Sequence, residues 1–143
     1  MLQYYFPVIF VIAFNTIYHI CAKNIPGNAN PLALLVATYM IAAATSFVLF
    51  VATTGNNQSF VEQIKAITWA PVFLGFAIVG LEFGFILIYR VGWNLSLASL
   101  VCNAGVAMVL IVIGLLIYKE QINSYQVAGI ILCLAGLALI NKP

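Results

Sequence analysis

The chain has 143 residues, of which 65% are hydrophobic and only 6% are charged, and its formal net charge is +2. A soluble domain of this size normally carries about 25% charged residues on its surface. The composition therefore excludes a soluble enzyme, a nucleic-acid-binding module and a disordered tail, and it indicates an integral membrane protein.

Five apolar runs are each long enough for a helix to cross a bilayer, which needs about 20 apolar residues. We predict transmembrane helices over residues 4–21, 32–53, 68–89, 95–118 and 124–140. Asn30 followed by Pro31 is typical of a helix start, and Asn123 with Ser124 offers the same kind of cap to the last helix. The predicted fold class is an all-α membrane protein, with residues 1–143 forming a single domain.

The loop over residues 54–67 is polar and then briefly amphipathic. Its stretch Ser59-Phe60-Val61-Glu62 fits a capping box, which predicts a short interfacial helix. An ordinary surface loop is the alternative.

Positive charge gives little preference for one orientation in the membrane. With five spans, Lys23, Arg90 and Lys142 fall on one side and Lys65 and Lys119 on the other. Basic residues favour cytoplasmic loops. A difference of one basic residue between the two sides is therefore compatible with insertion in both directions. Two antiparallel copies would then form an inverted repeat, as in many transporters. A single orientation set by Lys23 and Arg90 is the alternative.

Glu82 lies within the third predicted span, in Gly80-Leu81-Glu82-Phe83-Gly84. A charge at a helix centre in the membrane costs about 2.5–3.5 kcal/mol, and such a residue usually faces a cavity or a partner. Low polarity favours the protonated form of a carboxyl group. We therefore expect Glu82 to couple protons or bind a cation. The alternative is a structural acid that pairs with Arg90 or His19 or reaches water.

Other polar side chains share helix faces and are candidates for the same cavity. Asn15, Tyr18 and His19 follow i, i+3, i+4 spacing in the first span, and Ser96, Ser99 and Asn103 share a face in the fourth. The second span carries Thr38, Tyr39, Thr45 and Ser46. Such residues also join helices by simple hydrogen bonds. The candidates for proton coupling or substrate binding are Glu82, Asn15, Tyr18, His19, Ser99 and Asn103.

Small residues predict close helix packing. Gly80 and Gly84 form a G-x-x-x-G beside Glu82, and Gly129, Cys133 and Gly136 form a stripe in the last span. This stripe suits a contact within the chain or between subunits, and we favour a dimer contact.

Catalytic and metal-binding patterns are missing from the sequence. It has no H-E-x-x-H or G-x-S-x-G, and its three cysteines lie far apart without Cys/His spacing. We therefore expect no catalytic residue, no metal site and no cofactor, and we do not expect an enzyme.

The C-terminal third, Tyr118-Lys119-Glu120-Gln121-Ile122 followed by Gln126 and by Gly129 and Gly136, resembles the end of an EamA-type repeat. Asn30-Pro31, Tyr39, Lys23 and the stretch from Glu82 through Tyr89-Arg90 to Ser99 are also similar to that repeat. EamA repeats belong to the drug/metabolite transporter superfamily. The resemblance implies a multi-pass protein of a bacterial inner or plasma membrane, and a structural role for Glu120.

Most members of that superfamily carry two such repeats in opposite orientations, and this chain carries one. The resemblance therefore implies a ten-helix homodimer, parallel or antiparallel, or pairing with a second half-size subunit. It also implies export of a small metabolite or drug-like solute, which we expect to exchange for protons at Glu82. The partners would be this solute, protons and the lipid bilayer, with no nucleic acid.

Three alternative functions stay open. One is a half-size subunit of a flippase for a lipid-linked substrate. Another is a membrane-embedded interaction protein without transport, in which Glu82 only pairs with Arg90. The third is an exporter similar to the small multidrug resistance family, whose last helix also carries two glycines seven residues apart. That family has four helices and an essential glutamate in the first, where this chain has Asn15, Tyr18 and His19.

Overall fold

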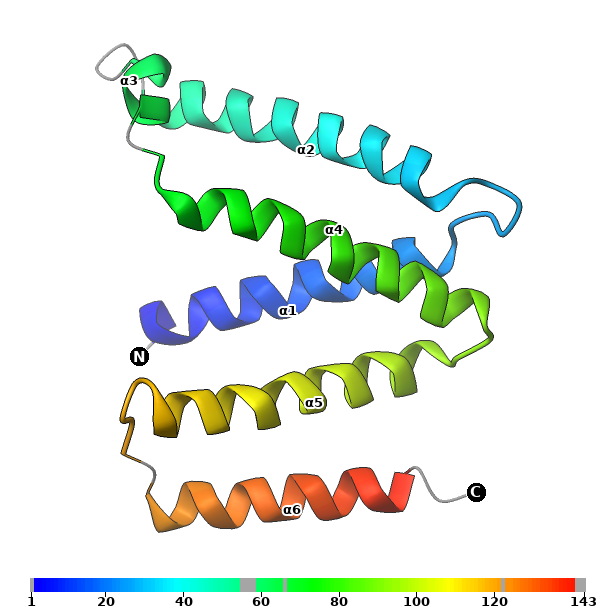
Figure 1. The fold of residues 1–143 in the computed structure, drawn as a ribbon, viewed down its shortest axis with the longest axis vertical. Helices are drawn as coiled ribbons and strands as arrows, with labels where there is room; N and C mark the ends of the chain where they lie inside the picture. The colour runs from blue at the N-terminus through cyan, green and yellow to red at the C-terminus, as the bar shows by residue number, and fades with distance from the viewer. Residues whose placement is uncertain (1, 55–58, 66, 122, 141–143) are drawn as a thin grey trace. The chain divides into compact units, whose positions relative to one another are not determined.

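The computed structural model describes residues 2–54, 59–65, 67–121 and 123–140, and all elements in these residues are α-helices (Figure 1). They are, in chain order, α1 (Leu2–Lys23), α2 (Pro31–Thr54), α3 (Phe60–Lys65), α4 (Trp69–Arg90), α5 (Leu95–Leu116) and α6 (Ser124–Ile140).

Four of the five predicted spans are confirmed as helices long and apolar enough to cross a membrane, namely α1, α2, α4 and α5. The described part of α6 is apolar but has 17 residues. At 1.5 Å per residue it is about 25 Å long, slightly less than the hydrocarbon core of a typical bilayer. The fifth crossing therefore stays a prediction.

The expected caps are present at two helix starts. Asn30 Oδ1 accepts a hydrogen bond of 2.9 Å from the backbone N–H of Leu32, next to Pro31 at the first helical position. Asn123 Oδ1 accepts from the N–H of Tyr125, and the N–H of Asn123 donates to Gln126 Oε1 at 2.8 Å. These bonds satisfy backbone donors that a helix N-terminus leaves unpaired.

The short amphipathic segment is helical, so the loop alternative is wrong for residues 60–65. The Phe60 ring contacts the rings of Phe47 and Phe50 in α2, with centroids 5.2 and 5.5 Å apart. Helix α3 is therefore held against the C-terminal part of α2 by aromatic packing.

The chain divides into two compact units, Met1–Gly92 and Trp93–Pro143. In the first unit α4 packs against both α1 and α2, and its position between them is visible in Figure 1. The described parts of α1 and α2 do not pack against each other. Helix α4 is thus the central helix of this unit.

The core of the first unit lies near the C-terminal ends of α1 and α4. Ala22, Ile86, Tyr89 and Leu35 of α2 are buried there, together with His19, which is 6% exposed. The Tyr89 hydroxyl and His19 Nδ1 form a hydrogen bond of 2.9 Å, and Lys23 Nζ lies 5.4 Å from the centroid of the Tyr89 ring. The bond satisfies two polar groups that would be costly to bury unpaired.

Arg90, the last residue of α4, contacts the loop between α1 and α2. Its Nη2 donates hydrogen bonds to the carbonyl oxygens of Pro26, at 3.2 Å, and of Ala29. The end of α4 is therefore tied to the connection that joins the other two long helices.

Threonine hydroxyls in the long helices donate to carbonyl oxygens one turn earlier. In α2 these bonds run from Thr38 to Leu34 at 3.0 Å, from Thr45 to Ile41 at 2.8 Å and from Thr53 to Leu49 at 2.7 Å. Thr16 of α1 does the same to Ile12. Such bonds satisfy a hydroxyl inside its own helix.

In the second unit α5 packs against α6. The turn after α5 uses Lys119 at φ 53°, and the N–H of Glu120 donates to the Gly114 carbonyl at 3.0 Å. A Cβ at Gly114 would lie 2.5 Å from Glu120 Oε2, so glycine permits the Glu120 carboxylate to fold onto α5. This packing agrees with the structural role implied for Glu120.

The Tyr89–His19 hydrogen bond gives a prediction about stability. Tyr89→Phe keeps the ring and removes the hydroxyl, so it should lower the free energy of unfolding by about 1 kcal/mol or more. Thermal unfolding in detergent, followed by circular dichroism, measures the change. The control is Tyr125→Phe in α6, because Tyr125 is 85% exposed. Equal effects of the two variants would contradict the prediction.

Candidate functional site

Glu82 lies half-buried in the second half of α4 and lines a cavity of about 190 Å³ in the first unit. All three long helices of this unit, together with Ile25 just after α1, contribute to the walls. The lining residues are Tyr18, Cys21, Ala22, Ile25, Thr38, Glu82 and Ile86. The carboxyl group predicted to be functional therefore borders a space that a small group can enter.

Two tyrosine hydroxyls accompany Glu82. Tyr18 from α1 and Tyr39 from α2 both interact electrostatically with its side chain. Both hydroxyl oxygens are buried. The Tyr39 hydroxyl is a hydrogen-bond partner of Glu82, whereas the Tyr18 hydroxyl has no hydrogen-bond partner within the described residues. Buried polar groups are normally paired, so an unpaired hydroxyl beside an acid is unusual for a purely structural cluster.

The residues considered as structural partners of Glu82 are engaged elsewhere. Arg90 donates to the carbonyls of the α1–α2 loop, and His19 bonds to Tyr89. The thermodynamic cost of holding Glu82 in the membrane is thus not offset by an ion pair with either residue.

His19 is buried beside the cavity rather than in its lining. Its ring packs against Tyr18, Phe85 and Tyr89, with centroid distances of 5.1, 4.8 and 6.3 Å. These contacts make His19 part of the packing that holds Tyr18 and α4 together. A role in proton coupling stays a prediction.

The remaining polar candidates are Asn15, Ser99 and Asn103. Asn15 shares a helical face with Tyr18 and His19 by spacing, but it is exposed and does not line the cavity of Glu82. Ser99 and Asn103 lie on α5 in the second unit, where Ser99 Oγ donates to the Ser96 carbonyl at 3.1 Å. Their part in the site stays a prediction.

The small-residue positions differ in their surroundings. A Cβ at Gly80, Gly84, Gly129 or Gly136 would meet nothing within 4 Å. Within each unit, no described helix therefore approaches these glycines closely. Gly129 and Cys133 line a cavity of about 380 Å³ between α6 and α5 in the second unit. The predicted dimer contacts stay predictions.

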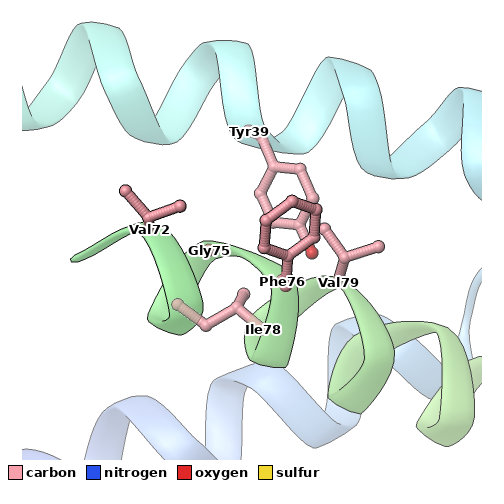
Figure 2. A pocket seen from close by; sticks show the side chains of 6 residues that line it. All are labelled: Tyr39, Val72, Gly75, Phe76, Ile78 and Val79. Carbon is pink, nitrogen blue, oxygen red and sulfur yellow. The ribbon is translucent and has the colours of Figure 1, made fainter. Parts of the chain in front are cut away.

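A second space in the first unit is an apolar groove of about 400 Å³ between α2 and α4. Figure 2 shows the Tyr39 ring reaching from α2 toward α4, beside Phe76 and Val79. The other lining residues are Val72, Gly75 and Ile78. Tyr39, which the sequence analysis did not select as a site residue, thus lines the groove and also interacts with Glu82.

The arrangement suits reversible binding rather than covalent chemistry. One carboxyl group and two hydroxyls can hold a proton or a single positive charge. Within the described ranges, no three His, Cys, Asp or Glu side chains come together as metal ligands.

Comparison with known proteins gives one family. The family model of the EamA-like transporter family matches residues 3–142. No curated protein and no solved structure shows significant similarity to the chain.

The unpaired Tyr18 hydroxyl gives a prediction that contrasts with that for Tyr89. Removing an unpaired buried hydroxyl leaves no partner unsatisfied, so Tyr18→Phe should change the free energy of unfolding by less than about 0.5 kcal/mol. Thermal unfolding in the same detergent tests this, with Tyr89→Phe as the destabilised reference. A loss at Tyr18 as large as that at Tyr89 would show that its hydroxyl is a structural group.

Proposed function

The chain belongs to the EamA-like transporter family, and from this premise we propose that it exports a small metabolite or drug-like solute in exchange for protons at Glu82. Family membership points to an integral membrane transporter of a small molecule rather than to an enzyme. The exchanged ion and the role of Glu82 are parts of the proposal.

The observation that carries the proposal is the placement of Glu82 in a cavity walled by three helices. A carboxyl group in a surrounding of low polarity favours its protonated form, and it becomes a strong attractant for positive charge when it ionises. Tyr18 and Tyr39 supply two hydroxyls that can donate to the ionised form or to a bound solute. His19 is the other titrating side chain close to this cluster.

The proposed mechanism is competition for one site. Proton and solute both stabilise the Glu82 cavity, but the carboxyl group cannot hold both at once. A bound ligand shifts the equilibrium between inward-open and outward-open states only if it binds one state more tightly. Release of a proton to one side would therefore be coupled to uptake of solute from that side.

This mechanism predicts that Glu82→Gln abolishes coupling and leaves the protein folded. Glutamine keeps the size of the side chain and cannot lose a proton. Substrate-driven proton flux should fall to about a tenth of the wild-type value or less. The measurement uses proteoliposomes that contain a pH-sensitive dye, challenged with amines, amino acids, nucleosides and drug-like cations.

The matched control is Glu62→Gln, which makes the same chemical change at an exposed acid of α3. It should transport like the wild type. Proton flux that persists in Glu82→Gln with unchanged pH dependence would contradict the coupling role of Glu82. The absence of flux from every protein, all folded, would contradict autonomous transport and favour a subunit that needs a partner chain.

We further propose that the chain acts as a homodimer in a bacterial cell membrane. Its single repeat is half of the arrangement implied by the resemblance to two-repeat transporters. Gly80 and Gly84 leave open space in front of α4, which a helix from a second copy could approach closely.

The dimer proposal predicts a protein mass of twice 15.5 kDa in mild detergent. Gly80→Leu should lower the dimer fraction by about tenfold, because its side chain would hold the partner helix away. Light scattering coupled to size-exclusion chromatography measures the protein mass. Ala70→Leu adds the same side chain near the start of α4 and serves as control. A monomeric wild type with full transport would overturn the proposal.

A further inference from the structure

The two spaces of the first unit lie along one face of α4. Val72, Gly75 and Val79 line the apolar groove, and Glu82 lines the cavity. These four residues follow i, i+3, i+7, i+10 spacing, which places them on one face of the helix. Glu82 lies seven positions after Gly75, which is about 10 Å along a helix. The groove and the cavity are therefore neighbours on the same helix.

Tyr39 connects the two spaces. Its ring forms part of the groove wall, and its side chain interacts electrostatically with Glu82 (Figure 2). The face of a tyrosine ring attracts a cation within about 6 Å of its centre. Its buried hydroxyl lies beside Glu82, so a cation at Glu82 would also lie close to the Tyr39 side chain.

The groove is almost entirely apolar, whereas the cavity carries a charged side chain. The groove is lined by apolar side chains and one glycine, with the Tyr39 hydroxyl as the only side-chain polar group. At the other end Glu82 carries the only formal charge in either lining. Gly75 deepens the groove, since a Cβ there would meet nothing within 4 Å.

We propose that the site takes a monovalent organic cation that places its positive charge at Glu82 and lays an apolar group about 10 Å long in the groove between α2 and α4. The proposal rests on the transport function proposed above and specifies its substrate class. Charge complementarity selects a cation over an anion, and the apolar lining selects an amphipathic molecule over a small hydrophilic amine.

Two other occupants would also fit an apolar groove. A lipid acyl chain needs no positive charge, and a helix from a second copy of this chain needs no small molecule. Both are overturning outcomes of the experiment, because neither makes occupation of the groove depend on Glu82.

The experiment measures equilibrium binding of labelled probes to the full chain in lipid nanodiscs. The probes are tetramethylammonium, (3-phenylpropyl)trimethylammonium and 4-phenylbutanoate, which separate charge from apolar body. The phenylpropyl cation should bind about tenfold more tightly than tetramethylammonium, because its apolar group leaves water. The anion should bind at least about tenfold more weakly than the phenylpropyl cation.

Variants of the protein show where the charged group and the apolar group of the bound cation lie. Gly75→Leu fills the groove and should remove the advantage of the phenylpropyl cation, with tetramethylammonium binding unchanged. Glu82→Gln should weaken both cations. Ala70→Leu, on a different face of α4, should change neither. If Gly75→Leu fails to fold by circular dichroism, Val72→Phe narrows the same groove and takes its place.

The outcomes separate this proposal from the transport proposal. Equal binding of the cation and the anion, or a Gly75→Leu variant that keeps the tenfold advantage, overturns the substrate class even if Glu82-dependent proton flux persists. A Gly75→Leu variant that changes only the oligomeric mass assigns the groove to a second copy and also overturns it. The expected binding pattern without proton flux supports the cation site and overturns proton exchange.

Discussion

Helix α4 contacts both α1 and α2, and the candidate site exists because of that arrangement. In a membrane the backbone is satisfied within each helix, so side-chain packing determines how helices meet. Here the contact with α1 is centred on buried His19, Ile86 and Tyr89. Glu82 sits one turn before Ile86 on the same helix, and it is therefore carried to the meeting point of three helices.

The same arrangement explains why polar groups and open space occur together. Tight packing near the C-terminal ends of α1 and α4 fixes Tyr18 through its ring contacts with His19 and Phe85. Further along α4, toward its N-terminus, the apolar groove opens between α4 and α2. The buried residues thus hold the chemical groups in place, and the adjoining groove provides room for a ligand.

Much of the fold and part of the candidate site could be predicted from the sequence. Apolar runs predicted the long helices, and the caps at Asn30 and Asn123 followed from side-chain chemistry. Glu82 could be predicted as a site residue because a charge in an apolar run is costly. Tyr39 was noted only as one polar residue of the second span, because a tyrosine in such a run fits a lipid-facing position equally well. Asn15 shares a helical face with Tyr18, yet it is exposed, since the buried part of α1 lies in its C-terminal half.

The threonines of α2 have a mechanical consequence. Each hydroxyl of Thr38, Thr45 and Thr53 is satisfied by a carbonyl of its own helix, so none of them bonds α2 to a neighbouring helix. Helix α2 can therefore slide or rotate against α4 without breaking these bonds. Aliphatic contacts have little directional preference and adjust over small displacements. The threonine hydroxyls therefore do not join α2 to α4, which meet through apolar side chains and the Tyr39–Glu82 interaction, whereas the His19–Tyr89 hydrogen bond joins α1 directly to α4.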